Sequence, residues 1–233
     1  MAAADPNALL MKLGANAFVR EVERRDEATN LCDQIHDAAY NGNTAAVWSL
    51  INREAMSEDN ISPDEPHPKD GRTLLHTAIQ GIPSTMVPFL LNECYASVDA
   101  RDSQGRTPLL YACALGSPRM VIRLIAYGAD LHTVDNEGCG AILIAAQAGH
   151  VNAVVWLFQA GAKVVPAYDG RTALHMAAFA GHASEQVGDC MLEKLLVLGA
   201  NLEETTDNGF TAMHFAALGN MPHAIHRLWA LGE

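Results

Sequence analysis

Residues 169–182 read DGRTALHMAAFAGH, and imperfect copies of this stretch recur along most of the chain. The copies begin at Asp70 (DGRTLLHTAIQG), Asp102 (DSQGRTPLLYACALG), Asp135 (DNEGCGAILIAAQAGH) and Asp207 (DNGFTAMHFAALGN), with a degenerate copy at Asp33 (DQIHDAAYNGN). When the histidine of the stretch, or the residue that replaces it, is taken as a marker, successive copies are 40, 34, 33, 32 and 39 residues apart, close to a period of ~33. Repetition at this period predicts one elongated array instead of separate domains.

Each copy carries the local signals of a turn followed by two short helices. Asp-Gly or Asp-x-x-Gly predicts a tight turn, because glycine adopts the positive φ that other residues resist. Thr107-Pro108 then predicts a helix start, with threonine as the cap and proline in the first turn. Small pairs such as Ala177-Ala178 allow a second helix to approach closely, and Gly116 and Gly149 are expected to end the first helix. The same capping role is expected of Thr73, Thr172 and Thr211.

The threonine, the histidine three residues later and the period resemble the ankyrin repeat over residues 31–233. This resemblance implies an all-α ankyrin-repeat solenoid of about six helix-turn-helix repeats with finger loops. A single unit is too thin to bury its own apolar side, so stability is expected to come from stacked neighbours. After an N-terminal helical cap or leader at 1–30, the expected repeats are 31–69, 70–101, 102–134, 135–167, 168–206 and 207–233.

Two copies are longer than the others, and the last ends on apolar residues. The extra residues of the first copy fall in the acidic segment 53–69, which predicts an enlarged finger loop that either engages a basic partner or has no binding role. The extra residues of the fifth copy fall in 183–190, between its two helices. Leu228 and Trp229 stand where a terminal repeat normally has a polar outer face. The array is therefore expected to continue, or to be followed by another domain, beyond residue 233, and its exposed end favours self-association.

Composition narrows the class of function. The formal net charge of −12 argues against a nucleic-acid partner, because phosphate binding needs clustered Lys and Arg. Five cysteines occur without CxxC pairs, which is typical of a reduced intracellular protein. No run approaches the ~18 apolar residues of a membrane span, and the N-terminus lacks the pattern of a signal peptide. The expected location is therefore the cytoplasm, without direct membrane insertion by this segment.

The ten histidines predict no catalytic or metal site. His76, His175 and His214 share one repeat position and so belong to different layers; the resemblance gives them the role of holding the finger backbone. His223 and His226 have metal-like spacing, but no cysteine or carboxylate pattern completes a ligand set. Nucleophile-elbow, phosphate-loop and dinucleotide motifs are missing from the sequence. The chain is expected to be non-catalytic, with no cofactor and no metal.

The expected function is therefore binding of a protein or an extended peptide. In the ankyrin architecture the first helices and the finger loops line a concave groove, and the position after the marker points into it. This position and the one three residues further carry apolar or aromatic side chains that are typical anchors for a partner. The alternative is that Met176 and Phe215 are ordinary choices at half-buried positions. The candidate groove residues are Tyr40, Tyr111, Ile144, Met176, Phe179 and Phe215.

A second resemblance covers residues 128–157, GADLHTVDNEGCGAILIAAQAGHVNAVVWL. This stretch is similar to the ankyrin region of ankyrin-containing Asp-His-His-Cys S-acyltransferases, which implies a cytosolic array whose groove recruits proline-containing substrate segments. An aromatic residue of that groove maps to Tyr111, whereas its partnering asparagine maps to Gly81, so half of that site is absent. The alternative function is thus the substrate-recruiting domain of a membrane palmitoyltransferase on the cytosolic face, with its catalytic part outside residues 1–233.

Overall fold

The computed structural model describes residues 30–53, 62–81, 85–180 and 185–232, with the backbone alone at 185–189. Within these residues all regular secondary structure is helical, apart from an isolated antiparallel bridge between Val134 and Gly140. The expected all-α repeat solenoid is confirmed. The expectation for residues 1–30, apart from residue 30 itself, and that for most of the acidic part of segment 53–69 lie outside the described residues.

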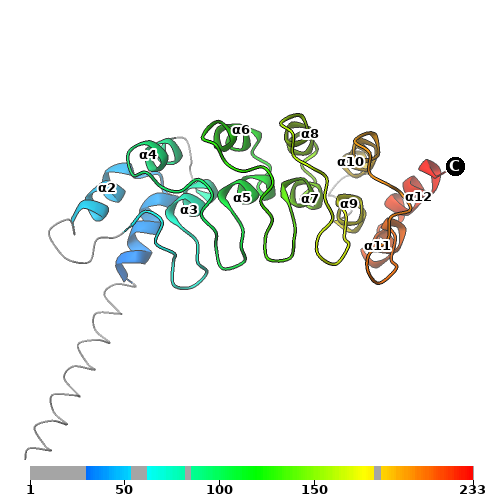
Figure 1. Ribbon diagram of the computed structural model, residues 1–233, viewed down its shortest axis with the longest axis horizontal. Coiled ribbons are helices and arrows are strands. Elements are labelled where there is room, and N and C mark those ends of the chain that lie inside the picture. Colours follow the sequence, from blue (N-terminus) through cyan, green and yellow to red (C-terminus); the bar gives the residue numbers. More distant parts are fainter. Residues whose placement is uncertain (1–29, 54–61, 82–84, 181–184, 233) are drawn as a thin grey trace, which may run out of the picture.

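The helices form two rows, and short connections join the rows into pairs (Figure 1). The inner row consists of helical residues 30–40, α3 (Leu74–Gln80), α5 (Pro108–Ala114), α7 (Ala141–Gln147), α9 (Ala173–Ala180) and α11 (Ala212–Leu218). The outer row consists of α2 (Thr44–Arg53), α4 (Met86–Asn92), α6 (Pro118–Ala126), α8 (Val151–Gln159), α10 (Glu185–Val197) and α12 (Pro222–Leu231). The outer helices trace an arch, and the inner helices and the finger loops lie on its concave side.

The inner helices begin where the sequence places their caps. Thr107 accepts a hydrogen bond from the Leu110 amide at its side-chain oxygen, and Pro108 occupies the first turn. Thr73 and Thr211 instead form capping boxes in which the histidine three residues later closes the reciprocal bond. Gly116 follows α5 with a φ of 62°, a left-handed conformation that favours glycine. The repeated sequence signals therefore fix both ends of these short helices.

One apolar core runs through the array between the two rows. Each inner helix packs on the next one, so the core is shared between neighbouring repeats. Cys113 is fully buried in this core at a position where other copies carry alanine. None of the described helices is long and apolar enough to cross a membrane.

The structure corrects one expectation about the fifth copy. Residues 185–190, expected to lie between its two helices, form the first turns of α10. As a result α10 has 13 residues, whereas α8 has 9. The extra residues of this copy lengthen the outer helix on the side of the array opposite to the fingers.

Candidate concave interaction surface

The six candidate groove residues lie at different depths. Tyr111 and Met176 are only 6% and 4% exposed, so they differ from the expectation of side chains that project into an open groove. Tyr40 and Phe179 are 49% and 44% exposed. Ile144 and Phe215 are partly buried. The structure therefore separates side chains that a partner can reach from side chains that support the surface from below.

Tyr111 is buried because it joins an ion pair in the finger loop before it. Its hydroxyl donates to Asp102 Oδ2 at 2.8 Å, and Arg106 Nη2 donates both to that hydroxyl at 2.7 Å and to Asp102 Oδ2 at 3.0 Å. The Arg106 guanidinium carbon also lies 4.6 Å from the centre of the Tyr111 ring. Tyr111 thus fastens the finger loop to the inner helix α5.

These contacts set the charges of the cluster. Burial raises the pKa of Tyr111 to about 12, and the hydrogen bond to Asp102 acts in the same direction. For Asp102, burial favours the neutral acid, but the Arg106 amide, the Tyr111 hydroxyl and the Arg106 guanidinium together hold its pKa below the usual value. At neutral pH Asp102 is therefore anionic and Tyr111 is a neutral hydrogen-bond donor.

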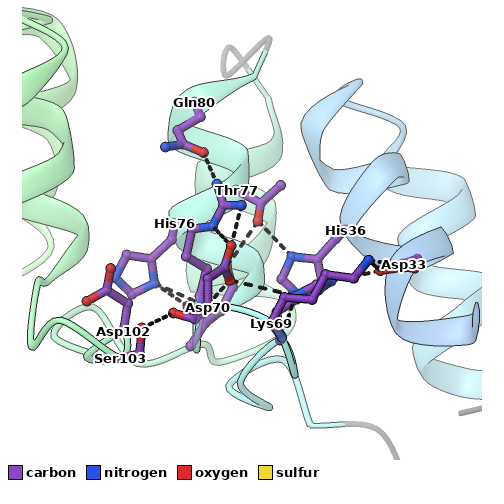
Figure 2. Close-up of polar contacts among 12 residues, drawn as sticks. Asp33, His36, Lys69, Asp70, His76, Thr77, Gln80, Asp102 and Ser103 are labelled. Carbon is purple, nitrogen blue, oxygen red and sulfur yellow. Dashed lines mark hydrogen bonds and ion pairs between the residues drawn. The ribbon is translucent and has the colours of Figure 1, made fainter. Parts of the chain in front are cut away.

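At the N-terminal end, polar side chains of the first repeats contact one another (Figure 2). Asp33 accepts from Lys69 Nζ at 3.1 Å and lies 2.8 Å from His67 Nε2, so the finger loop is tied to the first inner helix. Arg72 pairs with Asp70 in the same finger and donates to the side-chain oxygen of Gln80 on α3. Since Asp70 already neutralises Arg72, this end offers hydrogen-bonding groups more than net positive charge.

The marker histidines join successive repeats. The Thr73 amide donates to His76 Nδ1 at 3.2 Å, so Nδ1 is the acceptor and Nε2 carries the proton. His76 Nε2 then donates to the Arg106 carbonyl in the next finger at 2.9 Å. His175 repeats this arrangement with Thr172 and with the Phe210 carbonyl, also at 2.9 Å. These imidazoles are committed to backbone contacts between layers.

The C-terminal half of the concave surface is apolar. Phe179 on α9 and Phe215 on α11 meet edge to face, with ring centroids 6.4 Å apart. Leu218 occupies the same position on α11 as Phe179 on α9 and is 64% exposed. The list of candidates from the sequence did not include Leu218, although the repeat register that selected Phe179 also selects this residue. Phe179, Phe215 and Leu218 are called the apolar row below.

The described residues offer little for chemistry. No group of three or more His, Cys, Asp or Glu side chains among them is arranged to hold a metal ion. Burial raises the pKa of Cys113 to about 12 and that of Cys139 to about 11, so both are protonated thiols at neutral pH. What the surface offers is shape, apolar area and hydrogen bonds, which are the means of recognition.

Capped inner helices, paired outer helices and finger loops held by histidines define a protein built by stacking helix-turn-helix units. A family model described as ankyrin repeats (3 copies) matches residues 35–135 and 112–185, and one described as ankyrin repeat matches residues 169–207. The chain belongs to the ankyrin repeat family. Ankyrin repeats are in general non-catalytic units that bind other proteins, and the chain is a protein-interaction module in this general sense.

Comparison with characterised proteins gives relatives of diverse kinds. The human transient receptor potential cation channel subfamily A member 1 is 31% identical over 189 residues, which are 75% of this chain and 16% of the channel. The human ankyrin repeat domain-containing protein 63 is 31% identical over 163 residues, or 67% of this chain and 42% of that protein. The mouse neurogenic locus notch homolog protein 1 is 33% identical over 129 residues, which are 55% of this chain and 5% of that protein. The chain spans less than half the length of each.

Proposed function

We propose that the chain binds an extended segment of a protein partner along its concave surface, with an apolar anchor of the partner over α9 and α11. The observation that carries this proposal is the apolar row, in which Phe179 and Leu218 are 44% and 64% exposed beside Phe215. Exposed aromatic and aliphatic side chains grouped on a concave surface are typical anchors for a partner.

The polar end of the concave surface sets the orientation in which the proposed segment binds. Arg72 in the finger before α3 and Gln80 at the last turn of α3 offer guanidinium and side-chain amide groups, and Tyr40 is exposed at the end of the first inner helix. A segment that carries apolar side chains at one end and polar groups at the other therefore matches the surface in one orientation.

The buried candidates act indirectly in this proposal. Tyr111 holds the finger loop through Asp102, and Met176 lies beneath Arg171, whose guanidinium is 3.9 Å from the Met176 sulfur. Ile144 and Phe215 are only partly buried, and Phe215 belongs to the apolar row. Contact with the partner is assigned to Tyr40, Ile144, Phe179, Phe215 and Leu218.

The test is capture of partners by the chain and by variants that keep its fold. Phe179→Ala and Leu218→Ser are expected to lose the partner, because each removes apolar area that the complex would bury. Trp156→Ala is the matched control, since this aromatic side chain is 47% exposed on the outer helix α8. Circular dichroism verifies that all three variants are folded. Equal capture by all three variants would rule out the apolar row as the binding site.

The acidic finger segment is the competing site on the same molecule, and a deletion separates the two. His67 and Lys69 hold Asp33, so the deletion is limited to residues 54–61 and leaves those contacts in place. The concave proposal predicts that capture survives this deletion. Loss of the partner on deletion, together with retention by Phe179→Ala, would assign binding to the finger segment.

The second candidate is recruitment of substrates for a membrane S-acyltransferase. It rests on the resemblance of residues 128–157 and on an aromatic residue, Tyr111, at the matching position of the third repeat. Against it, the Tyr111 hydroxyl is engaged by Asp102, and Gly81 provides no side-chain amide. None of the three relatives named above is such an enzyme. Membrane spans and an Asp-His-His-Cys segment in the full gene product would favour it, and their absence would exclude it.

Both candidates place the chain inside the cell. The first fits the cytoplasm, and the second fits the cytosolic face of a membrane. Imaging of the tagged full gene product distinguishes the two locations.

A further inference from the structure

Tyr95 has a backbone conformation that its residue type resists. It follows the outer helix α4 with a φ of 55°, in the left-handed region. The equivalent residue, which stands before the alanine that leads into the next finger, is glycine in three other copies, at Gly128, Gly161 and Gly199. Asn220 is the other non-glycine residue with a positive φ in the described part of the chain, but asparagine is among the residue types that adopt this region. A bulky aromatic residue adopts it only at a cost in free energy.

The described part of the chain offers little that would offset this cost. Tyr95 is 84% exposed, so its ring buries little apolar area. Its side chain makes no hydrogen bond, ion pair or ring contact with the described residues. The connection is also longer than in the third copy, because the Ala96 amide donates to the Leu90 carbonyl whereas the Ala129 amide donates to the Leu124 carbonyl. A residue that breaks a local rule without a gain inside the fold is expected at a functional site.

Two side-chain hydrogen bonds join the segment around Tyr95 to its neighbours. Asp64 Oδ1 accepts from the Ser97 amide at 2.8 Å. Asn92 Nδ2 donates to the Tyr127 hydroxyl at 3.0 Å, and Tyr127 directly follows the outer helix α6. The segments brought together in this way are residues 62–66, 92–99 and 126–131.

These three segments carry only acidic charges. They contain no Lys, Arg or His, and their carboxylates are Asp64, Glu65, Glu93, Asp99 and Asp130. Arg101 and Arg123 lie close by in the sequence, but Arg101 donates to the Val134 carbonyl in the next finger, so the carboxylates remain in excess. The C-terminal end of a helix also favours a cation, and α4 ends in this surface. The surroundings of Tyr95 therefore favour a positively charged group.

We propose that Tyr95, Glu93 and Tyr127 form a contact surface for a basic segment of a protein partner, with an arginine side chain of that segment stacked on the Tyr95 ring. Charge complementarity selects this occupant, because the face of an aromatic ring attracts a guanidinium group and the surrounding carboxylates repel an acidic segment. Tyr95 follows an outer helix, whereas the apolar row belongs to inner helices. This surface is therefore separate from the concave one and independent of the function proposed above.

Two tyrosine-to-glycine substitutions test whether the fold itself needs the ring. Tyr95→Gly is expected to keep or raise the midpoint of urea unfolding, because glycine adopts a φ of 55° without strain. Tyr168→Gly, at a side chain that is 73% exposed and outside the left-handed region, is expected to lower the midpoint, because glycine adds freedom to the unfolded chain. A lower midpoint for Tyr95→Gly would show that the ring stabilises the fold and would overturn the proposal.

Binding is measured on the full chain by NMR titration with peptides of known composition. A hexa-arginine peptide is expected to shift the amide signals of residues 92–97 and of Tyr127, whereas a hexaserine peptide should leave them in place. Tyr95→Gly should weaken the affinity for hexa-arginine about two- to fivefold, the range of one exposed cation–π contact. Glu93→Gln should weaken it as well, and Phe179→Ala should leave it unchanged.

The site of the shifts separates this surface from general attraction to an acidic chain. Shifts confined to other residues, or equal affinities of the Tyr95→Gly chain and the unsubstituted chain, would overturn the proposal. Either result would leave the concave surface untested and its own proposal unaffected, since that proposal is tested through Phe179 and Leu218.

Discussion

His36 couples the stability of the first repeats to pH. The ring is 7% exposed, and its Nδ1 lies 2.7 Å from the Thr77 hydroxyl on α3. Burial lowers the pKa of His36 to about 4, and a positive charge on neighbouring His67 acts in the same direction. The carboxylates of Asp70 and Asp33 oppose the shift without reversing it. The folded chain therefore holds a neutral imidazole at pH values where the unfolded chain is protonated.

The expected result is a loss of stability on mild acidification. The folded pKa lies below the unfolded value of about 6.5, so the contribution of His36 is fully present above that pH and is lost as the pH falls towards about 4. Because of His36, the free energy of unfolding measured with urea should fall by roughly 2 kcal/mol when the pH is lowered from 7 to 5. His36→Gln should remove that part of the pH dependence, whereas His132→Gln at an exposed position should keep it. An unchanged pH dependence in His36→Gln would contradict this account.

Tyr111 is expected to matter for stability more than for direct contact with a partner. Tyr111→Phe removes the hydroxyl that donates to Asp102 and accepts from Arg106, but leaves the bonds from Arg106 to Asp102 in place. The free energy of unfolding should fall by about 1.5–3 kcal/mol, the net value of a hydrogen bond to a charged group. Tyr168→Phe, at a side chain 73% exposed, is the control and should change little. Partner capture should be retained by both variants, and a stable Tyr111→Phe chain that loses its partner would make Tyr111 a contact residue.

At the scale of single helices, the glycines that end them differ in what surrounds them. Gly116 has a φ of 62°, and a side chain there would collide with the imidazole of His150, which is held to the Ala114 carbonyl at 3.1 Å. Gly128 has a φ of 87°, and nothing lies within 4 Å of the place where a Cβ would be. Both glycines end a helix in the left-handed region, but only Gly116 is also enclosed.

A pair of alanine substitutions separates conformational strain from steric conflict. Gly128→Ala should cost about 1 kcal/mol, because alanine resists the left-handed region. Gly116→Ala should cost more, by roughly a further 1–3 kcal/mol, since His150 must move and give up its hydrogen bond. Thermal or urea unfolding of the two variants measures the difference. Equal losses of stability in the two variants would mean that His150 can move aside without a measurable loss of free energy.

The starts of the helices could be predicted from the sequence, whereas the length of α10 and the depth of Tyr111 could not. Thr107 and Pro108 marked the start of α5 correctly, because capping depends on residues only a few positions apart. The lengthening of α10 was missed, since the number of inserted residues does not reveal whether they form a loop or join the next helix. The depth of Tyr111 was also missed. The repeat register indicates which side a residue faces, but depth follows from partners such as Asp102 in the preceding finger.

For the whole molecule, the principal contacts join each helix to its neighbours in the array. Such an array opens from its ends, and its binding surface is assembled from side chains of several repeats. Polar groups gather over the first repeats and the apolar row over α9 and α11, so the concave surface has two unlike ends. The central claim is that a partner lies on this surface with its apolar part over the apolar row.

Site-specific photo-crosslinking tests that claim most directly. A photoreactive side chain is introduced at position 218 on the concave surface and, in a matched chain, at position 156 on the outer helix α8. Both native side chains are exposed, so neither replacement should disturb the core. The account predicts a covalent adduct with the partner from position 218 and none from position 156. An adduct from position 156 with none from position 218 would place the partner on the opposite face and contradict the account.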